Sequence, residues 1–148
     1  MPSVVDAIAA GARTESDIWA GALRDRPDWQ PVFSALVPEH LALGLETVYE
    51  AYLVHYGRPR LFAAPDGDEA ILLGDYLYAH GLVRIAEAGG VDAVEILAGL
   101  IARCAAQQAD GAVDDGAAWV DAARALGGSP SETAVARALA LHLARVAP

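Results

Sequence analysis

Two pairs of charged residues have the types and spacing that binding or catalysis could use. Glu46 and Glu50 stand four residues apart, which places two carboxylates on one helix face at the spacing of metal ligands. Arg58 and Arg60 follow in the irregular segment 57–65, and paired guanidinium groups can hold a phosphate through forked hydrogen bonds. The alternatives are a solvated helix face for the carboxylates and a surface loop for the arginines.

Other chemical motifs are missing from the sequence. It has no Ser/His/Asp elbow, no Gly-rich phosphate loop and no CxxC pair. The histidines do not have the spacing of metal ligands; they are His40, His55, His80 and His142.

The composition limits the class of protein. The chain has 148 residues, the size of one domain, and its net charge of −10 disfavours nucleic-acid binding. Hydrophobic residues make up 55%, so the chain should fold, and the single Cys104 excludes an internal disulfide. No stretch is long and apolar enough to span a bilayer, and the N-terminal apolar run lacks a preceding basic residue. We therefore expect a cytoplasmic protein without a transmembrane segment.

Apolar residues recur at helical spacing along nearly the whole chain, and Ala and Leu dominate them. The fold class predicted is all-α: one helical domain over residues 1–148. A helix stop is expected at Gly89-Gly90, because glycine readily adopts the left-handed cap conformation. The predicted helices cover residues 3–12, 14–24, 28–36, 39–56, 68–88, 91–109, 115–126 and 130–146.

The predicted helix 68–88 is apolar almost all the way round. Such a helix must be buried on every side, so either it is central or a partner covers one of its faces. Asp75 lies within it and is expected to be a buried carboxylate bonded to a neighbouring helix. A stripe of small or slender residues permits close helix contact; it consists of Ala70, Gly74, Leu77 and Gly81.

Four segments resemble the trans-polyprenyl diphosphate synthases, which have the isoprenoid synthase fold. Residues 70–79, AILLGDYLYA, resemble the family's GDYL helix, and residues 45–55, LETVYEAYLVH, resemble the helix that leads into its first Asp-rich motif. Residues 23–27, LRDRP, resemble the family's KRxRP segment, and residues 101–108 resemble the helix that ends in GQ. The resemblance implies a truncated isoprenoid-synthase-like bundle and a place in isoprenoid biosynthesis.

The sequence departs from the family where magnesium would bind. Residues 56–60, YGRPR, replace the DDxxD motif, and Asp110, Asp114 and Asp115 come too early to form the second motif and look like helix-capping loop acids. Mg²⁺ stabilises the departing pyrophosphate in this chemistry, so the chain alone should not catalyse prenyl transfer. No cofactor is expected on this chain, and Mg²⁺ would belong to a catalytic partner.

The resemblance therefore implies a small, non-catalytic subunit of a heteromeric hexaprenyl- or heptaprenyl-type synthase, supporting a large catalytic subunit. The residues expected to shape the prenyl-chain tunnel are Leu45, Val48, Ala51 and Tyr52. The residues expected at the subunit interface are Leu73, Gly74, Leu77, Tyr78 and Gly81. Two alternatives remain: a stand-alone binder of a prenyl diphosphate or another amphiphile, with Arg58 and Arg60 as anion ligands, and a homodimeric scaffold without prenyl chemistry.

Overall fold

The computed structural model describes residues 2–63, 66–112 and 114–147 of the chain. Within this part of the chain the fold is all-α, as predicted, and the only β pairing is an isolated bridge between Leu23 and Phe62. Residues 64 and 65 of the expected irregular connection lie outside the described residues. The helices are α1 (Val4–Glu15), α2 (Asp17–Ala22), α3 (Ala42–Tyr56), α4 (Gly67–Ala109), α5 (Gly116–Ala125) and α6 (Glu132–Val146), with 3₁₀ turns η1 (Ser34–Leu36) and η2 (Glu39–Leu41) before α3.

The helix predicted over residues 28–36 was wrong, because only η1 is helical there. Pro31 interrupts the segment and cannot donate a backbone hydrogen bond. The amides of Val32 and Ser34 instead donate to the Glu46 carboxylate, each at 3.1 Å. A side chain of α3 thus takes the hydrogen bonds that a helix would have used internally.

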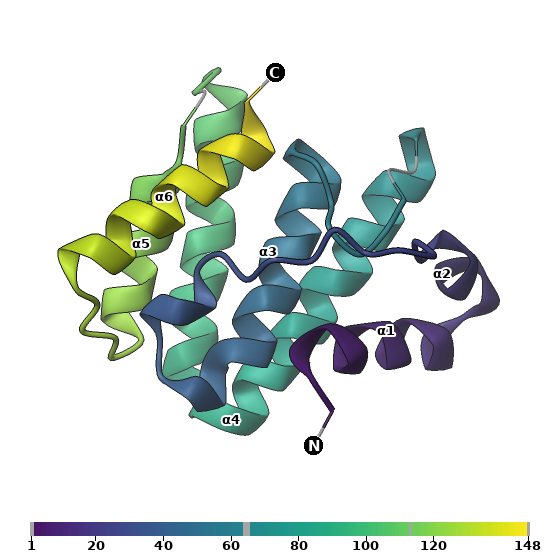
Figure 1. The fold of residues 1–148 in the computed structure, drawn as a ribbon, viewed down its shortest axis with the longest axis horizontal. Coiled ribbons are helices and arrows are strands. Elements are labelled where there is room, and N and C mark those ends of the chain that lie inside the picture. Colours follow the sequence, from purple (N-terminus) through teal and green to yellow (C-terminus); the bar gives the residue numbers. More distant parts are fainter. Residues whose placement is uncertain (1, 64–65, 113, 148) are drawn as a thin grey trace.

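Helix α3 occupies the centre of the molecule. Every residue from Gly44 to Val54 is buried, and α1 and α2 lie to one side of α3 while α5 and α6 lie to the other (Figure 1). Two hydrophobic clusters share this helix: one contains Leu45 and Val48, the other Ala51 and Val54. The fully buried helix is therefore α3. Of the two alternatives for residues 68–88, a central position is wrong, and cover by a partner stays a prediction.

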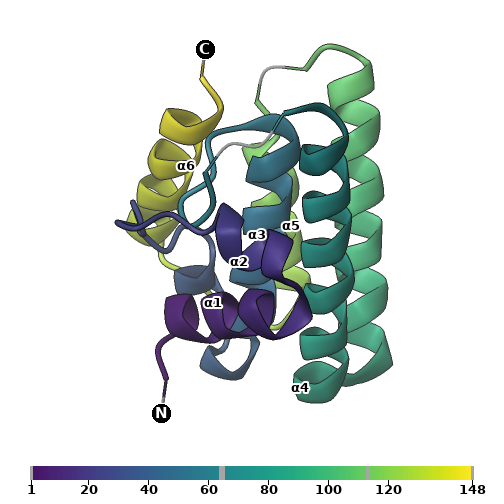
Figure 2. The ribbon, with the colours of Figure 1, turned by 90° about the vertical axis from the view of Figure 1, so that its right-hand side faces the viewer.

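Helix α4 is a hairpin of two helical halves, residues 67–89 and 91–109. They meet at Gly90, whose φ of 77° and ψ of −169° are not helical. The positive φ suits glycine, which lacks a Cβ. The two halves lie side by side (Figure 2), which confirms the predicted stop at Gly89-Gly90. No helix in the described part of the chain combines the length and apolar character needed to cross a bilayer.

Glycines allow the first half of α4 to approach α3 closely. A Cβ built on Gly44 of α3 would lie 2.6 Å from Cγ1 of Ile85, and one on Gly81 of α4 would lie 2.7 Å from Cγ2 of Val48. Both distances are too short for real carbon contacts, so each larger side chain fills the space that a glycine leaves. The small residues of both helices therefore serve the contact between α3 and α4.

This contact predicts opposite effects of alanine at two helical glycines. Gly81→Ala should destabilise the protein by about 1–3 kcal/mol, since the new methyl group would overlap Val48. Gly99→Ala should stabilise it by about 0.5–1 kcal/mol, since nothing lies within 4 Å of the new Cβ and alanine has the better helix propensity. Urea unfolding followed by circular dichroism measures both changes, and equal effects would contradict the packing described.

Candidate functional site

The residues expected to line a prenyl tunnel lie in the packed interior. The side chains of Leu45, Val48, Ala51 and Tyr52 are at most 2% exposed. Val48 fills the space above Gly81, and Tyr52 stacks on Tyr49 with ring centroids 5.9 Å apart. In this chain they are core residues, and the space beside them is filled by α4 and by aromatic rings.

Glu46, Glu50 and Arg60 form a fully buried ion cluster at one side of α3. Arg60 Nη1 lies 2.6 Å from Glu46 Oε1, and Arg60 Nε lies 3.0 Å from Glu50 Oε1. Arg60 also donates from Nη1 to the carbonyl of Gln30 and from Nη2 to the carbonyl of Glu46. Its guanidinium stands 4.1 Å from the centre of the Trp29 ring, a cation–π contact.

This cluster corrects two expectations drawn from the sequence. Arg60 is 0% exposed and every nitrogen of its guanidinium already donates a hydrogen bond, so it is not free to bind a diphosphate. Glu46 and Glu50, for which a metal site and a solvated helix face were the alternatives, are instead buried and paired with Arg60. Burial alone would lower the pKa of Arg60, but the charges and hydrogen bonds of the two carboxylates raise it above its ordinary value.

Removing the cation should therefore unfold much of the protein. Arg60→Gln should cost about 3–5 kcal/mol of stability, because it leaves two buried carboxylates without their counter-ion. Arg103→Gln is the matched control, since its bond to Asp121 joins two half-exposed side chains and should be worth no more than about 1 kcal/mol. Urea unfolding of both variants at pH 7 tests this, and similar losses would contradict the role given to the cluster.

A second polar cluster, around Asp115, joins α3 to the start of α5 and to α6. His142 Nε2 lies 2.9 Å from Asp115 Oδ1, and the Tyr52 hydroxyl donates to both oxygens of that carboxylate at 2.7 and 2.8 Å. The Tyr49 hydroxyl lies 2.7 Å from His142 Nδ1. Asp115 is buried, which corrects its interpretation as a loop acid that only caps a helix.

The sequence analysis missed the Asp115 cluster because its members are far apart along the chain. His142 follows Asp115 by 27 residues and Tyr49 by 93. The one available signal was His142 on an otherwise apolar helix face, and that pattern does not say which partner it will meet.

The chemistry open to the Asp115 cluster is limited by its burial. One oxygen or nitrogen atom from each of Asp114, Asp115 and His142 lies within 4.8 Å of the others, a spacing that could suit a metal ion. Both ring nitrogens of His142 and both carboxylate oxygens of Asp115 are already hydrogen-bonded within the chain. Cys104, which lies near Asp115, is a poor nucleophile, because burial and the charge of Asp115 raise the pKa of its thiol to about 12.

Asp115 should make the protein sensitive to acid. Burial alone would raise the pKa of Asp115, but hydrogen bonds from His142 and Tyr52 outweigh burial and hold it below the ordinary value. Because the folded pKa lies below the unfolded pKa, the stabilisation is complete above about pH 4, falls as the pH drops below the unfolded value near 3.9, and is gone below the folded pKa.

Urea unfolding between pH 7 and pH 3 measures this dependence. Asp115→Asn should lower stability at pH 7 by about 1–3 kcal/mol and flatten the acid limb of the stability profile. The exposed Asp121→Asn is the control and should leave the acid limb unchanged. If the stability of Asp115→Asn still falls steeply as the pH drops, other groups cause the acid sensitivity.

The residues expected at the subunit interface face into the chain. Leu73, Gly74, Leu77 and Gly81 are buried. Tyr78 is half-buried and meets the His55 ring edge-on, with centroids 5.3 Å apart. Asp75 is exposed, not buried as expected; its carboxylate lies 3.8 Å from His55 Nε2.

The outer side of α4 carries large apolar side chains that this chain leaves uncovered. Ile71 is 56% exposed, Leu72 58%, Val83 52% and Val91 81%. Ile71, Asp75, Ala79 and Val83 follow one another at intervals of four and so share a face of the helix. We call Ile71, Leu72 and Val83, which lie on the first half of α4, the outer α4 surface.

Arg58 lies in a different place from Arg60. It is exposed and lines a hollow of about 290 Å³ between α6 and the segment that precedes η1. Arg58 Nη1 donates to the carbonyl of Ala147 at 2.7 Å, and Arg145, which lines the same hollow, lies 2.7 Å from Asp28 Oδ2. The arginine that accompanies Arg58 is thus Arg145 of α6.

Comparison of the chain with protein-family models, with curated proteins and with solved structures finds none that matches. The resemblance to the prenyl diphosphate synthases rests on the sequence segments within residues 23–27, 45–55, 70–79 and 101–108.

Proposed function

We propose that this protein is a non-catalytic subunit that docks onto a catalytic prenyl diphosphate synthase through the outer α4 surface. The observation that carries the proposal is the exposure of three large apolar side chains, Ile71, Leu72 and Val83, on the first half of α4. Apolar side chains scattered singly need no explanation, but a group of them on one element is typical of a surface that a partner covers.

The arrangement of the outer α4 surface suits docking. Ile71, Leu72 and Val83 lie on the first half of α4, which α3 holds in place from the opposite side. A rigid apolar face of this kind can be buried with little loss of conformational entropy.

The prenyl synthase as partner is supported by the sequence resemblance. The two longest resembling segments form α3 and the first half of α4, which pack directly against each other. Where the family has its first magnesium-binding carboxylates, this chain has residues 56–60, and the last of them is the buried Arg60. These features favour a supporting role over turnover by this chain alone.

The proposed role differs in two details from the role expected from the sequence. Leu45, Val48, Ala51 and Tyr52 are packed within the chain, so any effect on a partner's product length would come from docking rather than from these side chains lining a tunnel. The docking residues proposed are those of the outer α4 surface, because Leu73, Gly74, Leu77 and Gly81 are used in internal contacts.

Co-expression with the full-length prenyl diphosphate synthases of the same organism tests the proposal. We expect one of them to copurify with this chain in equal amounts and to condense isopentenyl diphosphate with an allylic diphosphate faster when this chain is present. The double variant Ile71→Glu/Val83→Glu should abolish copurification, because it puts charges into the apolar interface.

Ile18→Glu is the matched control, since Ile18 is a similarly exposed apolar residue on α2 and should leave the complex intact. Size-exclusion chromatography of this chain alone would reveal a homodimer through the same surface. The proposal fails if no synthase copurifies, if synthase activity is the same with and without this chain, or if Ile18→Glu disrupts the complex as strongly as the double variant.

A further inference from the structure

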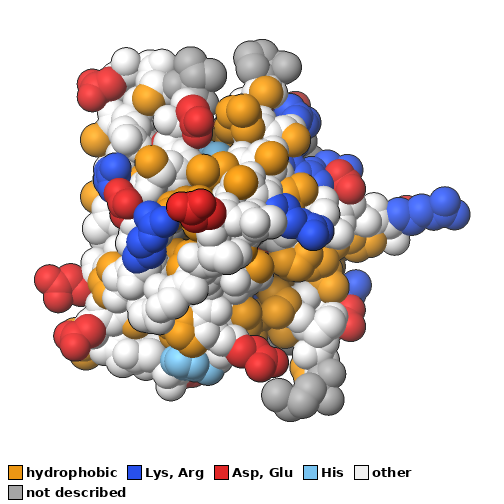
Figure 3. Space-filling model, turned by 60° about the vertical axis from the view of Figure 1, so that its left-hand side comes forward, with side chains coloured by type: hydrophobic (Ala, Val, Ile, Leu, Met, Phe, Trp, Pro, Cys, Tyr) orange, Lys and Arg blue, Asp and Glu red, His pale blue; other side chains and the backbone are white. Residues whose placement is uncertain are grey.

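A groove with one polar and one apolar end runs between α6 and the segment 28–35. Its polar end is the 290 Å³ hollow, and an adjoining hollow of about 220 Å³ shares Gln30, Val32 and Leu141 with it. Figure 3 shows basic and acidic side chains next to one another, among apolar ones, near the middle of the face that it draws. None of the residues that line the two hollows belongs to α4, so this groove is separate from the outer α4 surface.

The polar end carries positive charge. Arg58 and Arg145 line it together with a single carboxylate, that of Asp28, although the whole chain has a net charge of −10. Asp28 Oδ2 and the Asp28 carbonyl fix the position of Arg145 Nη2 at 2.7 and 2.9 Å. In the part of the chain that the structure describes, Arg58 donates from one nitrogen, Nη1. Arg145 Nη1 also donates to the Arg58 carbonyl at 3.4 Å, so the two arginines are joined within one hollow. Guanidinium groups favour an anion with several oxygen atoms.

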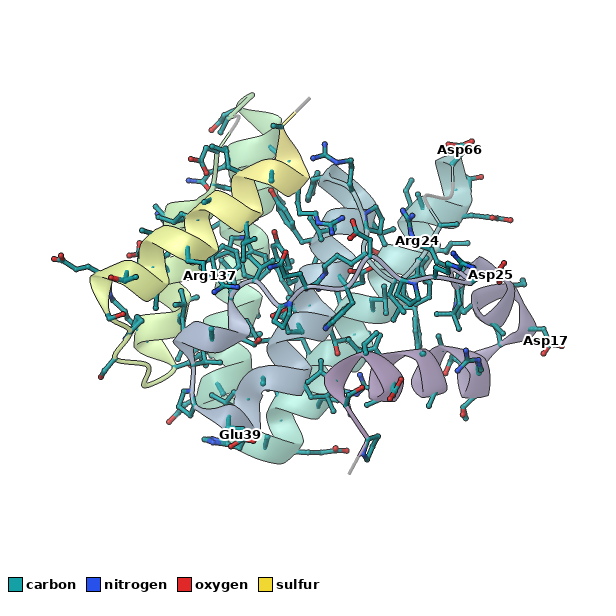
Figure 4. The ribbon with its side chains drawn as sticks, in the orientation of Figure 1. Asp17, Arg24, Asp25, Glu39, Asp66 and Arg137 are labelled. Carbon is teal, nitrogen blue, oxygen red and sulfur yellow. The ribbon has the colours of Figure 1, made fainter. Side chains whose placement is uncertain are left out.

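The other end of the groove is apolar. Pro31, Val32, Ala35, Ala134, Ala138 and Leu141 line most of it. Arg137 flanks this end, and Figure 4 shows it on the side of α6 that faces the segment before η1. The long stem of an arginine can cover apolar surface while its charged group stays in water.

The wall of the groove opposite α6 is held in place before any ligand arrives. Arg60 binds the Gln30 carbonyl at 2.9 Å, and the Asp28 amide donates to the Arg60 carbonyl at 2.9 Å. Val32 is fixed by its hydrogen bond to Glu46. The buried ion cluster therefore fixes this extended segment to α3. A site that needs no rearrangement binds its ligand more tightly.

We propose that this groove binds a small amphiphilic anion, with a carboxylate or phosphate head between Arg58 and Arg145 and a short alkyl tail along Val32 and Leu141. The division of the groove into a cationic end and an apolar end matches a ligand with one charged and one apolar end. The inference concerns residues outside the proposed docking surface, and it holds whether or not a synthase binds.

Four probes separate the head from the tail in isothermal titration calorimetry below the micelle-forming concentration. Octyl phosphate and octanoate carry both parts, inorganic phosphate carries only a head, and octanol carries only a tail. We expect one or both of the two amphiphiles to bind with a Kd below about 1 mM and at least tenfold more tightly than inorganic phosphate or octanol. Which of the two binds more tightly identifies the head group.

Variants then locate the binding. Arg58→Gln should weaken the tighter amphiphile about tenfold, and Ala134→Glu should weaken it by introducing a charge at the apolar end. Ala134 lies in the first turn of α6, where an acidic side chain suits the helix, so the second variant should remain folded. Arg124→Gln removes the same charge from an exposed position on α5 and should not change the Kd.

Three results would overturn the inference. The first is that neither amphiphile gives a heat of binding at concentrations up to about 5 mM, several times the expected Kd. The second is octanol binding as tightly as the amphiphiles. The third is a loss of affinity in Arg124→Gln equal to that in Arg58→Gln, which would assign binding to the overall charge.

Discussion

The attraction between Arg60 and the two carboxylates of α3 is the interaction on which the rest of the structure depends. Breaking it would strand Glu46 and Glu50 in an apolar interior, where an unpaired charge is very costly. The same carboxylates accept hydrogen bonds from the amides of Val32, Ser34 and Leu61. Two loops that are otherwise irregular are thereby fixed to the central helix, and their backbone groups are satisfied without a sheet or helix.

Helix α3 is thus unusual in combining full burial with several polar side chains. Glu46 and Glu50 serve the loops on one side, while Tyr49 and Tyr52 bind the polar groups of α5 and α6 on the other. Each of these four side chains has a hydrogen-bond partner inside the chain, which rigidifies the core.

The sequence predicted the helices well because their apolar periodicity and glycine stops are local signals. The division of residues 67–109 at Gly90 follows directly from the Gly-Gly pair. Burial was predicted less well, since the apolar character of residues 68–88 indicated a helix that is either central or covered by a partner, whereas the central helix is α3. Glu46 and Glu50 made α3 look amphipathic, and their partner Arg60 lies beyond the end of that helix, so the pairing depends on a loop path that periodicity does not encode.

The position of His142 has a consequence for how the molecule opens. If α6 detached from the rest of the protein, Asp115 and Tyr49 would both lose His142 as a hydrogen-bond partner, and water would enter the aromatic core around Trp119. Detaching α6 therefore requires almost as much free energy as opening the whole part of the core that α6 covers. Helices α3, α5 and α6 should behave as one cooperative unit in amide hydrogen exchange, whereas α1 and α2, which contribute no hydrogen bond to the Asp115 cluster, are free to open separately.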